Sequence, residues 1–539
     1  MKELGIEKNL GIDPASQRSP ACPFTPEMEE NMKRSCGVLL PVASLPSKYG
    51  IGCFSTEAYR FVDFLVKAGQ SYWQILPLGQ TGYGDSPYQS FSTFAGNPYF
   101  IDLEQLIGAG YLSREETEQF NFGSNPSYIE YDLIYMSRYL LLHHAYENSP
   151  YSLHPSDVWK QSAYNRDRYA FETFITNNKE WLEDYALYSA LKGRFENAAW
   201  TEWDDDIRLR QPEAMKKWHA ELVDDIRFYC FLQYMFFLQW KAVKDYANKH
   251  GISIIGDLPI YVAMDSADTW SHPEYFKLDG EGRPSVVAGC PPDAFSATGQ
   301  LWGNPIYDWD RHRAENFSWW RSRMERAFFL YDAVRIDHFR GFESYYEIPA
   351  QENTAMNGTW VQGPGIELFD ALQETIGGRQ VIAEDLGFLT PEVHKLLEET
   401  GYPGMKVLQF AFDAKSDSEY QPHNYNRNCV VYTGTHDNDT TRGWFENTDP
   451  EVRDYAYKYL GITGKETAVD AMIRTAMMSV ADICIIPIQD YLGLGNEARI
   501  NTPSTLGSNW KWRALPGTFT DKLAEHLLDL ARIYARLNQ

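Results

Sequence analysis

The stretch DAVRIDHF at residues 332–339 is a short apolar segment that ends in charged residues. Apolar runs rich in Val and Ile and bounded by Asp are typical of strands buried in a parallel sheet. The strand period of two places Arg335 and Asp337 on one face and Ile336 on the other. The sequence therefore predicts a buried strand whose carboxyl end carries a guanidinium beside a carboxylate.

Seven further runs of this kind occur along the chain, at residues 36–44, 71–79, 252–262, 380–387, 405–412, 429–438 and 483–490. Many of the intervals between them contain helical patterns, such as those at 58–69 and 390–401. Eight strands with helical crossovers predict an α/β fold, a (β/α)8 TIM barrel.

The intervals between the predicted strands are very unequal in length. We expect inserted subdomains at about 80–250 and 264–331. Residues 1–34 have no hydrophobic period and are predicted to be an N-terminal tail, before a catalytic barrel at 35–539. Within the second insertion, residues 286–309 are rich in Gly, Pro and aromatics and are predicted to form an ordered loop. A helical pattern ends the chain, so we expect no C-terminal β-sandwich domain.

Charge and composition exclude several classes of protein. The 539 residues carry a formal net charge of −25, which disfavours binding to nucleic acid. The most apolar run, residues 228–240, is about half the roughly 20 residues that a membrane span requires. The first 20 residues lack the apolar core of a secretory signal, and the seven cysteines show no metal-binding spacing. We therefore predict a cytoplasmic protein without membrane or nucleic-acid partners.

Charged residues end several of the predicted strands, and in TIM barrels the active site lies at that end. The main ones are Asp257, Asp337, Glu384 and Asp437. Arg335 is expected to lower the pKa of Asp337, as suits a nucleophile, whereas Glu384 suits a proton donor with a raised pKa. Such a pair matches the retaining glycosidases, and Asp437 could stabilise an oxocarbenium-like transition state.

Each of these residues also has a structural interpretation. A single Asp at a strand end is more often a helix cap or turn residue. Arg335 could form a salt bridge at the barrel rim, His436 could be a packing histidine, and an arbitrary aromatic side chain usually packs in the core. No GxxxxGK[ST], HExxH or GxSxG motif is present, and residues 493–498 fit a dinucleotide motif only formally.

Longer motifs give the sequence a resemblance to a known family. They are GYGDSPYQSFSTFAGNPYFIDL (82–103), PPDAFSATGQLWGNPIY (291–307), VRIDHFRGFE (334–343), AEDLG (383–387), YPGMKVLQFAFD (402–413) and VYTGTHDNDTT (431–441). These segments closely resemble the amylomaltases, the 4-alpha-glucanotransferases of glycoside hydrolase family 77 in the alpha-amylase clan. The resemblance extends from about residue 36 to residues 508–517.

The resemblance implies a role for each matching residue. Asp337 matches the nucleophile, Glu384 the general acid/base and Asp437 the transition-state stabiliser. Sugar-binding positions are matched by Arg335, His338, His436 and Asp257, groove-lining aromatics by Tyr88 and Trp302, and an outer glucan contact by Tyr83. The implied reaction transfers an α-1,4-glucan segment between maltooligosaccharides, starch or glycogen fragments, with no cofactor or metal. Residues 498–512 are less like the family and are predicted not to touch the three carboxylates.

Three alternatives remain open from the sequence. A hydrolase of the same clan would use the same three carboxylates with water as the acceptor. A metal-dependent barrel enzyme would use Asp257, Asp337, Glu384 and His436 as ligands. A glucan-binding protein without catalysis would need no paired acid and nucleophile.

Overall fold

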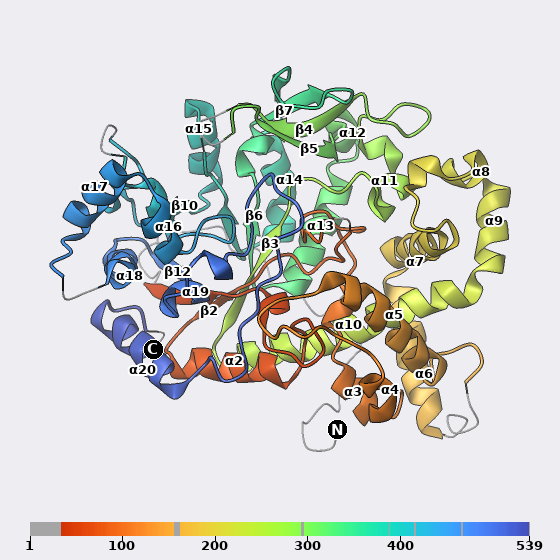
Figure 1. The fold of residues 1–539 in the computed structure, drawn as a ribbon. Coiled ribbons are helices and arrows are strands. Elements are labelled where there is room, and N and C mark those ends of the chain that lie inside the picture. The colour runs from red at the N-terminus through yellow and green to blue at the C-terminus, as the bar shows by residue number, and fades with distance from the viewer. Residues whose placement is uncertain are drawn as a thin grey trace.

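A computed structural model describes residues 34–82, 84–155, 162–292, 296–387, 389–413, 417–464 and 467–537. Eight parallel strands form a nearly closed barrel with helices around it (Figure 1). In spatial order the strands are β10 (Gly404–Val407), β11 (Cys429–Tyr432), β12 (Ile483–Pro487), β1 (Ser35–Leu39), β2 (Tyr72–Gln74), β3 (Ser253–Leu258), β6 (Ala333–Ile336) and β9 (Gln380–Ala383). The predicted TIM barrel is therefore confirmed: six of the eight strands lie inside their predicted runs, and β1 and β10 each begin one residue before theirs.

Closure of the barrel brings together β10 and β9, the two strands at the ends of this spatial order. The N–H of Ala383, at the end of β9, donates to the carbonyl of Pro403, directly before β10, at 3.0 Å. Side chains alternate between the two faces of the barrel, as a period of two requires. Ile255, Ala333 and Ile382 belong to a core cluster made of strand residues, which fills the interior. Their neighbours in the strands pack into the larger core that includes the helices.

Helices occupy most intervals between the barrel strands. Between β1 and β3 lie α2 (Thr56–Lys67), α3 (Leu103–Gly108), α4 (Arg114–Glu118), α5 (Tyr131–Glu147), α6 (Ser162–Asn177), α7 (Lys179–Arg194), α8 (Asp205–Arg208), α9 (Pro212–Glu221) and α10 (Val223–Lys249). Between β3 and β10 lie α11 (Ala267–Ser271), α12 (Trp309–Ala314), α13 (Ser318–Leu330), α14 (Ile366–Ile376) and α15 (Pro391–Thr400). The last are α16 (Thr441–Asn447), α17 (Pro450–Leu460), α18 (Ala468–Met478), α19 (Ile488–Tyr491) and α20 (Asp521–Ile533).

Short 3-10 helices mark several of the loops, at η1 (Val42–Ser44), η2 (Pro98–Phe100), η4 (Trp200–Glu202), η5 (Pro273–Tyr275), η6 (Phe339–Phe342), η7 (Leu408–Phe410), η8 (Pro422–Asn424) and η9 (Asn496–Ala498). The apolar run 228–240 lies within α10 and is largely buried, as its composition predicts. No helix among the described residues is long and apolar enough to cross a membrane. The tail at 1–34 falls outside the described residues up to position 33, so the predicted domain division stays a prediction.

The prediction of a loop at 286–309 is wrong. This segment contains β4 (Val286–Cys290) and β5 (Gln300–Pro305), which join β7 (Ser344–Pro349) and β8 (Thr359–Gln362) in an antiparallel sheet of order β5-β4-β7-β8. Gly289 permits the close pairing, because a Cβ there would lie 2.3 Å from the carbonyl oxygen of Gln300. The glycines suggested a loop. The local pattern could not reveal the pairing, because the strand β7 that pairs with β4 lies some 50 residues further along the chain.

A fold prediction concerns Gly256 in β3. A Cβ at this position would lie 2.0 Å from the ring of Tyr331, whose hydroxyl is held by the N–H of Leu78 at 3.2 Å. We expect Gly256→Ala to destabilise the protein by about 1–3 kcal/mol, since the buried ring has no room to move. The matched control is Gly193→Ala in α7, where a Cβ meets nothing within 4 Å. It should stabilise by up to about 1 kcal/mol. Thermal unfolding of both variants checks this, and equal Tm values would contradict it.

Candidate active site

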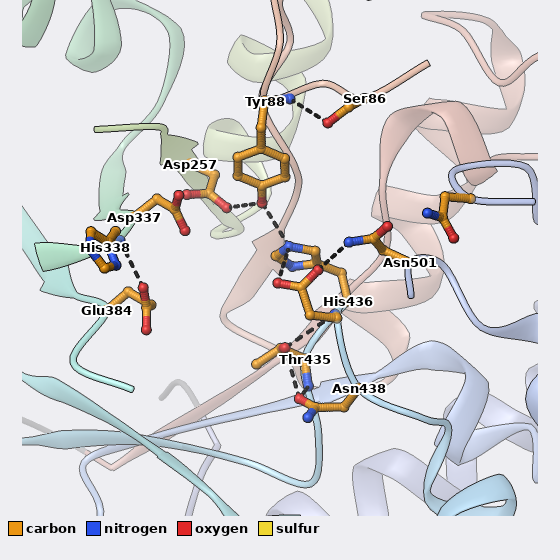
Figure 2. A network of polar contacts seen from close by, with 12 residues as sticks. Ser86, Tyr88, Asp257, Asp337, His338, Glu384, Thr435, His436, Asn438 and Asn501 are labelled. Atoms are coloured by element: carbon orange, nitrogen blue, oxygen red, sulfur yellow. Dashed lines mark hydrogen bonds and ion pairs between the residues drawn. The ribbon is translucent and has the colours of Figure 1, made fainter. Parts of the chain in front are cut away.

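The strand register places the charged residues of β3, β6 and β9 on the inner face of the barrel, at its carboxyl end. Asp257 pairs in register with Arg335, two residues after Ile255 and Ala333, which face the interior. Asp337 and Glu384 follow directly after Ile336 and Ala383, which are also register partners. Parallel strands in register point their side chains to the same side, so the carboxylates converge (Figure 2).

Arg335 is the cation at the base of this cluster. Its Nη1 lies 2.8 Å from both carboxylate oxygens of Asp257 and 3.1 Å from Oδ1 of Asp337. Its Nε lies 3.3 Å from the sulfur of Met405. Arg335 is 3% exposed and Asp257 2%, so the ion pair is out of water. A buried pair of this kind is retained only where hydrogen bonds satisfy both partners, as they do here.

A second chain of contacts runs from Asp257 to Asp437. The hydroxyl of Tyr88 donates to Oδ2 of Asp257 at 2.6 Å and lies 2.9 Å from Nε2 of His436. Since the hydroxyl has one proton, it accepts from the imidazole. The rings of Tyr88 and His436 stack, with centroids 5.4 Å apart. Nε2 of His436 also lies 3.3 Å from Oδ2 of Asp437, which closes the network.

The prediction that residues 498–512 do not touch the carboxylates is wrong. The amide of Asn501 donates to Oδ1 of Asp437 at 2.6 Å, and Nη2 of Arg499 donates to the Asp437 carbonyl at 2.7 Å. Trp510 packs its ring 5.8 Å from that of Tyr88. This segment follows the eighth strand and has no strand pattern or catalytic motif of its own. Nothing in the sequence pattern placed it here, because its position depends on the chain returning across the barrel mouth.

Glu384 is held by two backbone donors. The N–H of His338 lies 2.7 Å from Oε2, and the N–H of Leu386 lies 2.8 Å from Oε1. His338 has φ 49° and ψ 51°, a left-handed conformation that is uncommon outside glycine. Its imidazole packs edge-on against Trp302 of β5, with centroids 4.8 Å apart. The second sheet therefore reaches the carboxylate cluster through this pair of rings.

The pKa values of the two neighbouring carboxyls are both raised. Burial raises the pKa of Glu384, although Arg335 and the two backbone N–H groups oppose it. Burial also raises the pKa of Asp337 to about 7, assisted by Asp257 and Glu384. The expectation of a lowered pKa for Asp337 is therefore wrong. Arg335 does lower it, but its charge is largely neutralised by the ion pair with Asp257.

The pKa values of the remaining titratable groups of the site shift in different directions. The pKa of Asp437 is lowered to about 2, because the charge and hydrogen bond of His436 and the amide of Asn501 outweigh its burial. Burial alone would lower the pKa of His436, but Asp437 raises it above its ordinary value. Burial lowers the pKa of His338 to about 3. Near neutral pH, His338 is therefore uncharged and Asp437 is anionic.

The structure brings together the predicted site residues that it describes, among them Tyr88, Asp257, Asp337, His338, Glu384 and His436 (Figure 2). Arg335 lies at the base of this cluster. Tyr83 lies outside the described residues. Other acids at strand ends have structural partners. Asp490 accepts from the hydroxyls of Thr433 and Thr441, and Asp385 accepts from the N–H of Met405. These hydrogen bonds give the two acids structural roles.

Comparison with known proteins agrees with this geometry. The model of glycoside hydrolase family 77, described as 4-alpha-glucanotransferase, matches residues 40–518. The chain belongs to this family. A 4-alpha-glucanotransferase of Clostridium butyricum is 52% identical, with 92% of this chain and 99% of the relative covered. That of Thermus thermophilus is 47% identical, over 94% of this chain and all of the relative.

The fold of the family is also seen in solved structures. An amylomaltase from Streptococcus agalactiae in complex with acarbose superposes with a TM-score of 0.89 at 41% identity. The match covers 94% of this chain and 100% of that chain. The family model and the solved amylomaltase structure therefore each match nearly the whole length of this chain.

A prediction follows from the His436–Asp437 pair. Replacing Asp437 by Asn removes the charge that raises the pKa of His436, so burial should bring that pKa below its ordinary value of 6.5. NMR titration of labelled histidines, with His436→Asn to assign the resonance, measures the change. Asp439→Asn is the control, because Asp439 pairs with Arg499 instead. A pKa of His436 unchanged in Asp437→Asn would contradict the pairing.

Proposed function

We propose that this member of glycoside hydrolase family 77 acts as a 4-alpha-glucanotransferase on α-1,4-glucans, through the carboxylates at the ends of β6, β9 and β11. It moves a glucan segment to the 4-hydroxyl of an acceptor glucan or glucose, with retention of configuration. The observation that carries the assignment of residues is the register of β6 and β9, which sets Asp337 and Glu384 side by side on one face. Two adjacent carboxyls are what a retaining double displacement requires.

In the first step Glu384 donates its proton to the oxygen of the scissile bond while Asp337 attacks the anomeric carbon. The bond to the leaving glucan breaks, and a covalent glycosyl-enzyme forms on the Asp337 carboxylate. In the second step Glu384 takes the proton from the acceptor 4-hydroxyl, whose oxygen displaces Asp337. The raised pKa of Glu384 suits the donor step, and the backbone N–H groups of His338 and Leu386 stabilise the carboxylate it becomes.

Asp437 stabilises the positive charge that develops on the sugar ring. Its lowered pKa keeps it anionic, and the amide of Asn501 fixes its orientation. Tyr88, His436 and Asp257 form a polar wall whose hydrogen-bonding atoms suit sugar hydroxyls. The amphipathic Trp302 ring, half-buried on β5, suits the apolar face of a glucose unit.

The choice between acceptor sugar and water separates this function from a hydrolase of the same clan. Trp302 and His338 pack against each other beside Glu384, and the antiparallel sheet that carries Trp302 lies beside the barrel. This arrangement limits the access of water to the glycosyl-enzyme, while a bound glucan presents its own hydroxyl. The sheet therefore supports transfer over hydrolysis.

The alternative of a metal enzyme gains no support from the geometry. The oxygens of Asp257 are engaged by Arg335 and Tyr88, and those of Glu384 by backbone N–H groups. Among the described residues no group of three or more acidic, His or Cys side chains is arranged to hold a metal ion. The cytoplasmic location is also part of the proposal. Among the described cysteines, Cys36, Cys53, Cys230, Cys429 and Cys484 form no disulfide, which suits a reducing compartment.

The first test is chromatography of the products formed from pure maltotriose. We expect glucose and a ladder of longer oligosaccharides, with no matching rise in total reducing ends. Asp337→Asn and Glu384→Gln should each lower the rate by roughly 10²–10⁴-fold or more while the Tm is kept. Glu398→Gln, on the exposed face of α15, is the control and should retain full rate. Maltose and glucose with rising reducing ends would instead establish a hydrolase.

The pH profile tests the assignment of the proton donor. Activity should fall as the pH rises through the raised pKa of Glu384, because the proton for the leaving group is lost. It should also fall at low pH, as Asp337 becomes protonated and can no longer attack. The two limbs belong to the interacting pair. In Glu384→Gln, azide as an external nucleophile with an activated glucosyl donor should give a profile without the alkaline limb; a retained limb would contradict the assignment.

The role of the second sheet is tested by Trp302→Ala. Removing the indole opens the space beside His338 to water, so we expect the share of hydrolysis in the products to rise several-fold. Reducing-end assays set against the oligosaccharide ladder measure this share. Trp360→Ala is the control, because Trp360 on β8 is 43% exposed and packs on Tyr346 and Arg340 instead. An unchanged product ratio in Trp302→Ala would contradict this role of the second sheet.

A further inference from the structure

The chain after β12 holds the segment that carries Asp437. This residue lies five positions beyond the end of β11 and is half-buried, so hydrogen bonds outside the barrel sheet orient it. The N–H of Asn501 donates to the carbonyl of His436 at 3.0 Å, which sets the two segments side by side (Figure 2). The side-chain amide of Asn501 then reaches Oδ1 of Asp437 at 2.6 Å. The orientation of Asp437 therefore depends on where Asn501 is held.

Arg499 connects the two segments through all three nitrogens of its guanidinium. Nη2 donates to the backbone carbonyl of Asp437 at 2.7 Å, and Nε donates to the backbone carbonyl of Asn501 at 2.7 Å. Nη1 forms an ion pair with Asp439. These acceptors come from both segments, and a planar guanidinium can bond to all of them at once. One side chain thus holds the backbone of Asp437 and the backbone of the residue that orients its carboxylate.

The two ends of the connection around Asp437 are fixed separately, from α19. Asp490 accepts from the hydroxyl of Thr433 at 2.5 Å, and from the N–H and the hydroxyl of Thr441 at 2.7 and 2.6 Å. All three of these residues are buried. Thr433 directly follows β11 and Thr441 begins α16, so Asp490 ties both ends together. Loss of Arg499 would therefore release the middle of the connection and leave its ends in place.

We propose that Arg499 is a positioning residue, which holds the Asp437 carboxylate in the orientation that stabilises the transition state. It acts through the backbone of Asp437 and through Asn501. This role rests on the proposed function of Asp437. A carboxylate that stabilises charge in the transition state contributes to kcat more than to substrate binding. A displacement of about 1 Å in such a group can cost roughly 10²-fold in rate.

The first test needs no substrate and detects the orientation of Asp437 through its neighbour His436. In Arg499→Met the Asp437 carboxylate is no longer held beside the imidazole, so the pKa of His436 should fall. Loss of the positive charge of Arg499 would by itself raise that pKa, so the sign of the shift separates lost orientation from lost charge. Asp257 and Arg335, which also act on His436, are unchanged. NMR titration measures the shift, and an unchanged or raised pKa would overturn the proposal.

Kinetics with maltotriose give the second test. Arg499→Met should lower kcat by roughly 10–100-fold with KM little changed, because an interaction of the transition state is lost. Arg499→Lys keeps the charge but not the planar fork, so it should restore only part of the rate. The Lys variant also carries both tests if the Met variant does not fold. A lower Tm with full kcat well below that Tm would show a role in the fold alone and refute positioning.

Arg442→Met is the matched control. Arg442 lies on α16, just after the same connection, and its guanidinium donates to Glu446 and to the carbonyl of Gly493. This variant should keep both the wild-type kcat and the pKa of His436. Equal losses in the two Met variants would assign the effect to net charge and count against Arg499. If the wild-type protein formed no ladder from maltotriose, the proposed function would fail, while the NMR titration would still decide whether Arg499 orients Asp437.

Discussion

The ion pair between Arg335 and Asp257 is the interaction on which the site depends. It links β3 to β6 across register partners on the inner face of the barrel, where both side chains are nearly fully buried. Removing one partner of such a pair costs about 3–5 kcal/mol, because a charge is left buried without compensation. The same guanidinium contacts Asp337, and the same carboxylate accepts from Tyr88. Arg335 and Asp257 therefore form one hydrogen-bonded unit with Asp337 and Tyr88 of the proposed active site.

Excess negative charge gives this unit its chemistry. Asp257, Asp337, Glu384 and Asp437 converge on one permanent cation, Arg335, and on His436, whose charge depends on its proton. Burial is the main cause of the raised pKa values of Asp337 and Glu384. Because the pairs with Arg335 and His436 offset two of the other carboxylates, charge repulsion from the remaining ones adds to this effect. Since both pKa values are raised, one of the two carboxyls can hold the proton that the proposed acid catalysis needs. Burial favours the protonated form of Asp337 and Glu384, and the pair with His436 favours the charged form of Asp437.

Segments outside the barrel strands complete the site. The antiparallel sheet brings Trp302 against His338, and the chain after β12 brings Asn501 to Asp437. Loops and insertions on a rigid barrel are where specificity usually arises, since they vary without disturbing the core.

Local pattern alone was enough for the barrel strands and for the charged residues at their ends. A run such as DAVRIDHF carries apolar residues on both faces, which is typical of a buried strand, and its period of two already sets Arg335 and Asp337 on one side. The family motifs added the roles of Glu384 and Asp437. Tertiary structure decided what depends on distant partners: the strands at 286–290 and 300–305, the contact of Asn501 with Asp437, and the sign of the pKa shift of Asp337. Strand pairing, the return of the chain across the barrel and the burial of Asp337 among other charges depend on residues far apart in the chain, so no local pattern encodes them.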